Sequence, residues 1–199
     1  MRHHHRRDGF TIIELVVTLA LFGVLMALGL PAFTSFIQNA QIKNAAENAV
    51  TGLNLAKAEA IRRNAPVRFQ FVSTMTATCA LSTSSGSWVV SLDDPTGLCN
   101  TAASDTTAPR IIQSYAIGDG APKVAVAATG SSSVTFNGLG RVTGTAISQV
   151  NFTHVTSVCE HVNTTTGTAR CLRVLINTGG SVKLCDPKVT ATTDPRHCS

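Results

Sequence analysis

Residues 10–30 read FTIIELVVTLALFGVLMALGL, and Glu14 is the only charged residue in this stretch. After Glu14, no charged residue occurs before Lys43. At ~1.5 Å per residue, a helix over residues 10–30 is about 30 Å long, which matches the hydrocarbon core of a bilayer. The sequence therefore predicts one helix that crosses a membrane once.

The segment before this run, residues 1–9 (MRHHHRRDG), is short, basic and polar. A cleaved secretory signal has the opposite order, because its small-residue cleavage site follows the apolar stretch. Three arginines precede the run and few basic residues follow closely, so the positive-inside rule places the N-terminus in the cytoplasm and the remainder outside. A carboxylate such as Glu14 is costly in lipid, so we expect it to face a partner, with snorkelling into headgroups as the alternative.

The composition differs between two parts of the chain, an apolar N-terminal segment and a remainder rich in Thr, Ser and Gly. The 199 residues are 44% hydrophobic and 14% charged, with a formal net charge of +5. This balance excludes a disordered chain, which combines low hydrophobicity with high net charge. A single apolar run also excludes a multi-pass membrane protein, so we expect one domain beyond the helix.

Residues 31–64 continue the helical pattern, with apolar positions mostly three or four residues apart. These positions are Ile42, Ala46, Ala49, Leu53, Ala56 and Ala60. We expect the stripe to pack against a sheet as part of the core. The helix should end at Asn64-Ala65-Pro66, because the residue before a proline is disfavoured in the α region, and its total length should be about fifty residues.

From Val67 onward the apolar residues alternate with polar ones, which indicates β-strands. Strand-like runs occur at residues 67–71, 76–81, 87–92, 111–117, 124–127, 133–136, 147–152, 171–176 and 182–185. The sequence NTGG at 177–180 predicts a hairpin turn, and residues 93–109 and 156–169 predict surface loops. The predicted fold class is α+β, a long N-terminal helix packed on an antiparallel β domain over residues 65–199.

Six cysteines lie outside the apolar run, and no CxxC pair is present, so disulfides fit better than a metal site. They are Cys79, Cys99, Cys159, Cys171, Cys185 and Cys198. Fifteen pairings are possible. Pairing sequential neighbours is the simplest, and each bond would close a short loop. Disulfides imply an oxidising compartment, consistent with the predicted placement of this domain outside the cytoplasm.

The N-terminal motif resembles the prepilin-peptidase site of type IV pilins and type II secretion pseudopilins. Gly9 precedes the expected cut, Phe10 follows it, and Glu14 is the fifth residue of the mature chain. The resemblance implies cleavage between Gly9 and Phe10 and methylation of the new amine on Phe10. It also implies that Glu14 neutralises the N-terminal amine of a neighbouring subunit, and that Pro31 kinks the helix.

Three further stretches resemble the GspH/FimT pseudopilins and minor pilins. They are the helix end and first strand at residues 53–69, the run FNGLGR at 136–141, and the C-terminal tail with LCDP at 184–187 and DPRHC at 194–198. The resemblance covers the whole chain. It is strongest at the N-terminus and weakest between the helix end and the tail.

No catalytic or cofactor motif is present: the chain has no GxSxG elbow and no GxxxxGK loop, so we predict neither an enzyme nor a cofactor. The family resemblance also raises DNA binding, through a GRxR motif in the last hairpin. The matching residues here are Gly180-Ser181-Val182-Lys183, in which serine replaces the first arginine and lysine the second. A basic patch could still form from Arg170, Arg173, Lys183, Lys188 and Arg196.

These observations predict a minor pilin or pseudopilin, processed by prepilin peptidase and held in the inner membrane by residues 10–30. The amphipathic stretch 31–64 would continue the stalk, and other pilins would bind through the N-terminal helix in the tip or initiation complex of a pilus. A type II secretion pseudopilin is the first alternative, and a DNA-binding minor pilin is the second.

Overall fold

The computed structural model describes residues 10–159, 167 and 169–199. The chain divides into two compact units, Met1–Ile37 and Gln38–Ser199. The second unit contains the end of the long helix and all of the described β-strands. The predicted loop at 156–169 falls largely on residues outside the described ranges.

Helix α1 (Ile12–Arg63) has 52 residues, which confirms the predicted single helix and its length. It ends where Asn64 adopts a left-handed conformation (φ 49°), two residues before Pro66. The N–H of Ala65 then donates to the carbonyl of Ala60 at 3.2 Å, a common way to close a helix C-terminus. The backbone is helical through Pro31, and the kink expected there stays a prediction.

The described strands form two antiparallel sheets. The five-stranded sheet has the order β3-β2-β1-β5-β6 and the four-stranded sheet the order β4-β7-β8-β9. The bounds are β1 (Val67–Val72), β2 (Ser87–Ser91), β3 (Ile111–Tyr115), β4 (Val124–Thr129), β5 (Ser133–Phe136), β6 (Val142–Thr143), β7 (Gln149–His154), β8 (Leu172–Ile176) and β9 (Val182–Cys185), with a short 3-10 helix η1 (Ile117–Asp119). This architecture confirms the predicted α+β class.

The strand predicted at residues 76–81 is wrong. Only an isolated bridge between Val72 and Leu81 forms there, because Cys79 is bonded to Cys99 and the segment turns back over the sheet. The two-residue strand β6 was not predicted, since Val142 and Thr143 are too few to show alternation. The predicted turn at 177–180 joins the antiparallel pair β8 and β9, as expected.

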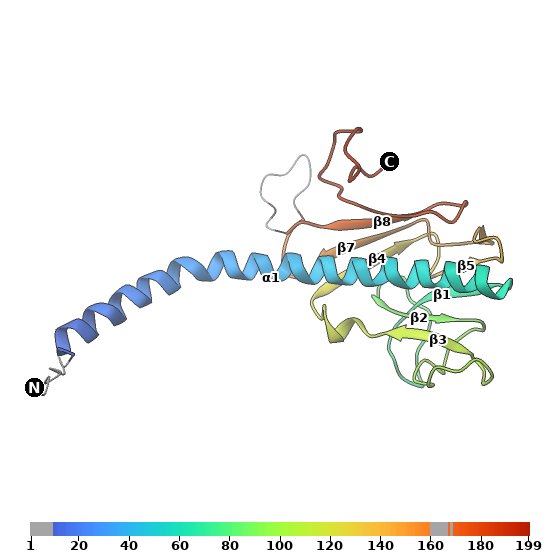
Figure 1. Cartoon of the computed structure of the whole chain (residues 1–199), viewed down its shortest axis with the longest axis horizontal. Coiled ribbons are helices and arrows are strands. Elements are labelled where there is room, and N and C mark those ends of the chain that lie inside the picture. The colour runs from blue at the N-terminus through green and yellow to red at the C-terminus, as the bar shows by residue number, and fades with distance from the viewer. Residues whose placement is uncertain (1–9, 160–166, 168) are drawn as a thin grey trace, which may run out of the picture. The chain divides into compact units, whose positions relative to one another are not determined.

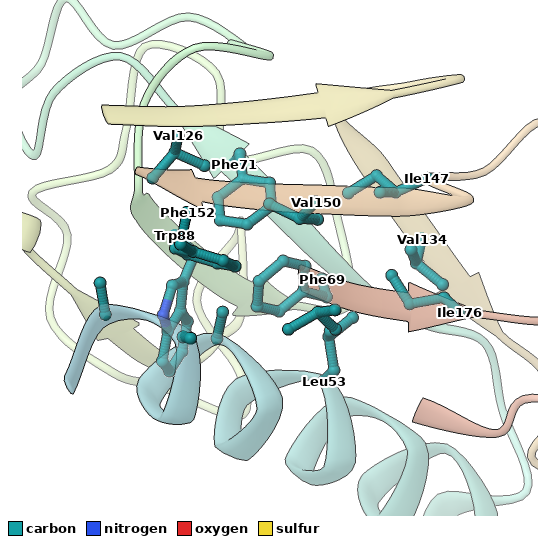
Figure 2. Close-up of a cluster of buried hydrophobic side chains, with 14 of the residues drawn as sticks. Leu53, Phe69, Phe71, Trp88, Val126, Val134, Ile147, Val150, Phe152 and Ile176 are labelled. Atoms are coloured by element: carbon teal, nitrogen blue, oxygen red, sulfur yellow. The ribbon is translucent and has the colours of Figure 1, made fainter. Parts of the chain in front are cut away.

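The core lies between residues 38–63 of α1 and the two sheets (Figure 1). All six residues of the predicted helical stripe are buried. Figure 2 shows Phe69, Phe152 and other side chains from both sheets gathered above Leu53. The ring of Phe69 contacts Phe71 edge-on with centroids 5.0 Å apart and lies 5.5 Å from Trp88. The stripe therefore has the packing role that its spacing predicted.

A second, smaller core covers the other face of the five-stranded sheet. Val72, Val89 and Ile111 are buried there together with the Cys79–Cys99 disulfide. The segments that carry the two cysteines form a flap, defined here as residues 73–104. Because the flap covers β2 from outside, this strand is buried on both faces instead of alternating.

Candidate functional site

The first part of α1 presents an uncovered apolar surface. Every large apolar side chain from Phe10 to Met26 is exposed, and Phe10 itself is 81% exposed. They are Phe10, Ile12, Ile13, Leu15, Val16, Val17, Leu19, Leu21, Phe22, Val24, Leu25 and Met26. A helix that is apolar on all sides needs a membrane or the core of a larger assembly around it.

Glu14 lies in the first turn of α1 and is exposed. The hydroxyl of Thr11 accepts the backbone N–H of Glu14 at 3.3 Å, which caps the helix. The pattern Thr-x-x-Glu is that of a capping box, a helix-start signal that the sequence analysis missed. Glu14 therefore has a local role at the positive end of the helix besides the predicted pairing with a neighbour.

Two N-terminal predictions remain, the cleavage between Gly9 and Phe10 and the helix that crosses a membrane. Gly9, the residue before the expected cut, lies outside the described residues, whereas Phe10 lies just inside them. Within the described ranges, no helix is both long and apolar enough to pass through a membrane.

The six cysteines form three disulfides between sequential neighbours, the pairing that sequence order makes simplest. The bonds are Cys79–Cys99, Cys159–Cys171 and Cys185–Cys198, with Cα–Cα distances of 6.1, 5.4 and 5.2 Å. The first holds the flap, the second closes the loop between β7 and β8, and the third ties the C-terminal tail to β9. The flap and the C-terminal tail have little secondary structure of their own, so the first and third bonds restrict segments that the sheets do not hold.

The loop between β7 and β8 is also fixed to α1. The Ser157 hydroxyl donates to the side chain of Gln38 at 2.6 Å, and the backbone N–H of Arg170 donates to the Asn39 side chain at 2.7 Å. These contacts lie where the second unit begins. They attach the base of the β domain to the helix on which it is built.

Most of the five candidate DNA-contacting residues have partners within the chain. Arg170 forms an ion pair with Asp186 at 2.5 Å, and Arg196 forms one with Asp194 at 2.8 Å. Arg173 donates to the Asn151 side chain at 2.7 Å, Lys183 to the Ser199 hydroxyl at 3.2 Å, and the backbone N–H of Lys188 to Asp186 at 2.9 Å. Two of the five cations, Arg170 and Arg196, are thus paired with carboxylates, and a paired cation attracts phosphate less strongly, so this arrangement gives DNA binding little support.

Among the groups whose pKa values are moved by their surroundings, Asp194 and His154 lie in the C-terminal tail and at the start of the β7–β8 loop. The hydrogen bonds from Arg196 lower the pKa of the Asp194 carboxyl to about 2. Burial, together with the charge of Lys123, lowers the pKa of His154. Nδ1 of His154 lies 3.0 Å from the Thr156 hydroxyl and accepts the Thr156 N–H at 3.3 Å, so the neutral ring holds the start of the β7–β8 loop.

Three stretches that the sequence singled out separately meet at the C-terminal end of α1. Nζ of Lys57, on the helix, donates to the carbonyl of Gly180 in the last hairpin at 2.9 Å. A Cβ on Gly180 would overlap the carbonyl oxygen of Gly140, and a Cβ on Gly138 would overlap the side chain of Asn64. Contacts between residues so far apart in sequence leave no local pattern, so the sequence predicted each stretch by itself but not that the three meet.

Comparison with known families identifies two regions of the chain. The profile of a family described as Type II transport protein GspH matches residues 45–180. A profile described as Prokaryotic N-terminal methylation motif matches residues 4–30. The first match includes residues 45–63 of α1 and strands β1 to β8, and the second includes the apolar run with Phe10 and Glu14.

Individual proteins give more limited similarities. A fimbrial protein of Moraxella nonliquefaciens is 46% identical over 39 residues, which are 20% of this chain and about a quarter (25%) of the length of that relative. A crystal structure of the type IV minor pilin FimU from Pseudomonas aeruginosa has a TM-score of 0.43 and 15% identity, covering 75% of this chain and 91% of FimU. A second crystal form of FimU gives a TM-score of 0.40 and 14% identity, with 71% and 90% covered. With the GspH profile matching most of its length, the chain belongs to the GspH/FimT family of type IV minor pilins and pseudopilins, a family of structural subunits.

Proposed function

We propose that this protein is a minor pilin that is cut between Gly9 and Phe10, methylated on Phe10 and built into the tip or initiation complex of a type IV pilus. Residues 10–30 hold it in the inner membrane with the N-terminus in the cytoplasm and the β domain in the periplasm. The same residues then pack among the helices of neighbouring subunits, and the carboxylate of Glu14 pairs with a neighbour's N-terminal amine.

The observation that carries this proposal is the exposed apolar surface of α1 from Phe10 to Met26, with one carboxylate in its first turn. Nothing in the described chain covers that surface. Bilayer lipid accounts for the apolar residues, but a carboxylate near the end of such a helix calls for an opposite charge. A bundle of like helices supplies both apolar contacts and an amine for each carboxylate.

A type II secretion pseudopilin is the second candidate, favoured by the description of the GspH profile itself. It would use the same anchoring and the same charge pair. Deleting the gene separates the two roles, because loss of surface pili supports the pilus role and retention of exported proteins in the periplasm supports the secretion role.

Replacing Glu14 tests the charge pair, and the chain offers a matched control. Glu47 is an exposed glutamate on the same helix, and among the described residues its carboxylate pairs with Lys43 alone, at 3.7 Å. We expect Glu14→Ala to remain in the membrane fraction while its amount in the sheared filament fraction falls about tenfold or more, equivalent to the ~1.4 kcal/mol or more that one charge pair contributes. Glu47→Ala should be incorporated like the wild type.

Glu14→Gln distinguishes the charge pair from the capping role. Glutamine serves in a capping box but carries no charge. If docking depends on charge, Glu14→Gln is excluded from filaments as strongly as Glu14→Ala. Incorporation of both variants at the wild-type level would refute the docking role, and recovery by Gln alone would reduce Glu14 to a helix cap.

A further inference from the structure

The turn at residues 137–141, called here the Asn137 turn, is rigidly built. The N–H of Asn137 donates to the carbonyl of Arg141 at 2.9 Å, and the N–H of Gly140 donates to the carbonyl of Asn137 at 2.8 Å. The Asn137 side-chain oxygen also accepts the N–H groups of Leu139 and Arg141, each at 3.0 Å. The turn therefore keeps one conformation without help from Leu139.

The backbone of the Asn137 turn lies directly on the end of α1. A Cβ on Gly140 would come within 2.9 Å of the Ile61 side chain and 3.1 Å of Lys57. On the other side, the carbonyl of Gly140 abuts Gly180. The turn is thus held between the helix and the last hairpin, and a Cβ on Gly180 would overlap the backbone of Gly140.

Leu139, at the apex of this turn, is largely exposed to solvent. Leu139 is 79% exposed, and Ile61, which touches the same turn, is 50% exposed. The guanidinium of Arg141 is exposed and forms no hydrogen bond or ion pair with any residue that the structure describes. A single exposed leucine is ordinary. Leu139 is an exposed apolar side chain on a fixed turn, and the same turn contacts the partly exposed Ile61 and carries Arg141. These are features of a binding anchor, because a backbone that is already ordered lowers the entropy lost on binding.

We propose that the Asn137 turn is a plug that inserts Leu139, with Ile61 beside it, into an apolar socket on a neighbouring pilin-family subunit. Arg141 then meets a carboxylate at the rim of that socket. The proposal rests on the proposed function, because it needs an assembly in which subunits stand side by side.

The small size of the contact and the charge of Arg141 both favour a neighbouring subunit of a different kind as the partner. Two apolar side chains cover far less than the roughly 1,600 Å² of a stable protein pair. The plug therefore works only between subunits that their N-terminal helices already hold together at high effective concentration. A symmetric contact with a second copy of this chain is disfavoured, because it would bring two Arg141 side chains together.

The first test compares Leu139→Ser with Leu98→Ser, which removes an exposed leucine (46%) from the flap instead. Both variants are made in the full chain and followed in the membrane and sheared filament fractions. We expect Leu139→Ser to fall about tenfold in filaments, with an unchanged melting temperature, and Leu98→Ser to behave like the wild type. Arg141→Glu should fall as well, whereas Arg141→Lys should retain most of its incorporation.

The second test places a photo-crosslinking amino acid at position 139 or 98 of the full chain, in cells that make the assembly. We expect position 139 to crosslink to a different pilin-family subunit and position 98 to give no such product. Crosslinking only to a second copy or to lipid, or normal incorporation of Leu139→Ser, would overturn the plug alone. Absence of the wild-type protein from the filament fraction would overturn the proposed function, and the plug with it.

Discussion

The two parts of α1 have the same secondary structure and opposite surfaces. Up to Ile37, the large apolar residues with described side chains are exposed, from Phe10 and Ile12 to Phe33 and Phe36. From Gln38 onward, the apolar residues are mostly alanines on one face, and that face is buried from Ile42 to Ala60. The part up to Ile37 has apolar residues on all sides. The part from Gln38 has one apolar stripe, whose residues recur every three or four positions.

This difference separates contacts between molecules from contacts within the molecule. A helix with one narrow stripe of small residues can lie close to a sheet of its own chain. A helix with large apolar residues on every side cannot be satisfied by one neighbouring surface. Substitutions in the second part should therefore change the stability of the domain, whereas those in the first part should change assembly and leave the domain unaltered.

The largest expected effect comes from removing a core leucine. Leu53 is fully buried under Phe69, whereas Leu21 on the same helix is exposed. Leu53→Ala should destabilise the domain by about 2–5 kcal/mol, and Leu21→Ala by less than about 0.5 kcal/mol. The single tryptophan, Trp88, is buried in the domain, so its fluorescence during urea unfolding in detergent reports both values. An equal loss of unfolding free energy in the two variants would contradict the assignment of only the second part of α1 to the domain core.

A pair of glycines gives a smaller effect. A Cβ on Gly52 would lie 2.8 Å from the Phe69 ring and 2.9 Å from the Trp88 ring, whereas a Cβ on Gly23 would meet nothing within 4 Å. Gly52→Ala should lose about 1–3 kcal/mol from overpacking, partly offset by about 1 kcal/mol of better helix propensity. Gly23→Ala should leave the unfolding transition of the domain in place. A more stable Gly52→Ala variant would contradict the close packing of helix and sheet.

The smallest effect is a pH dependence confined to the domain. The folded state lowers the pKa of His154, so the unfolded chain binds a proton more readily. Stability should therefore fall as pH drops from about 7 through the unfolded histidine pKa of ~6.5, and rise again on return to neutral pH. His154→Gln should flatten the melting temperature between pH 7 and 5, and an unchanged slope in this variant would assign the dependence to another group.

The helix, its buried stripe, its end and most strands could be predicted from sequence, because each depends on a period or a local stop signal. The flap could not, because the Cys79–Cys99 bond and the second core override the strand-like pattern at residues 76–81. The meeting of Lys57 with Gly180 is a contact between distant residues that no local pattern encodes. The Thr11–Glu14 cap could have been predicted from the Thr-x-x-Glu pattern. The resemblance to prepilins instead predicted that Glu14 pairs with the N-terminal amine of a neighbouring subunit.

The most direct test of the distinction is the thermal unfolding of a chain that begins at Ser35, compared with the full chain in detergent. This truncation keeps the contacts of Gln38 and Asn39 with the β7–β8 loop and removes the apolar part of α1. If that part serves only contacts between molecules, the Trp88 fluorescence transitions of the two chains should lie within about 4 °C of each other, corresponding to ~1 kcal/mol at most. A drop well beyond that, or failure of the shortened chain to fold, would show that the apolar part also stabilises the domain and would contradict the account.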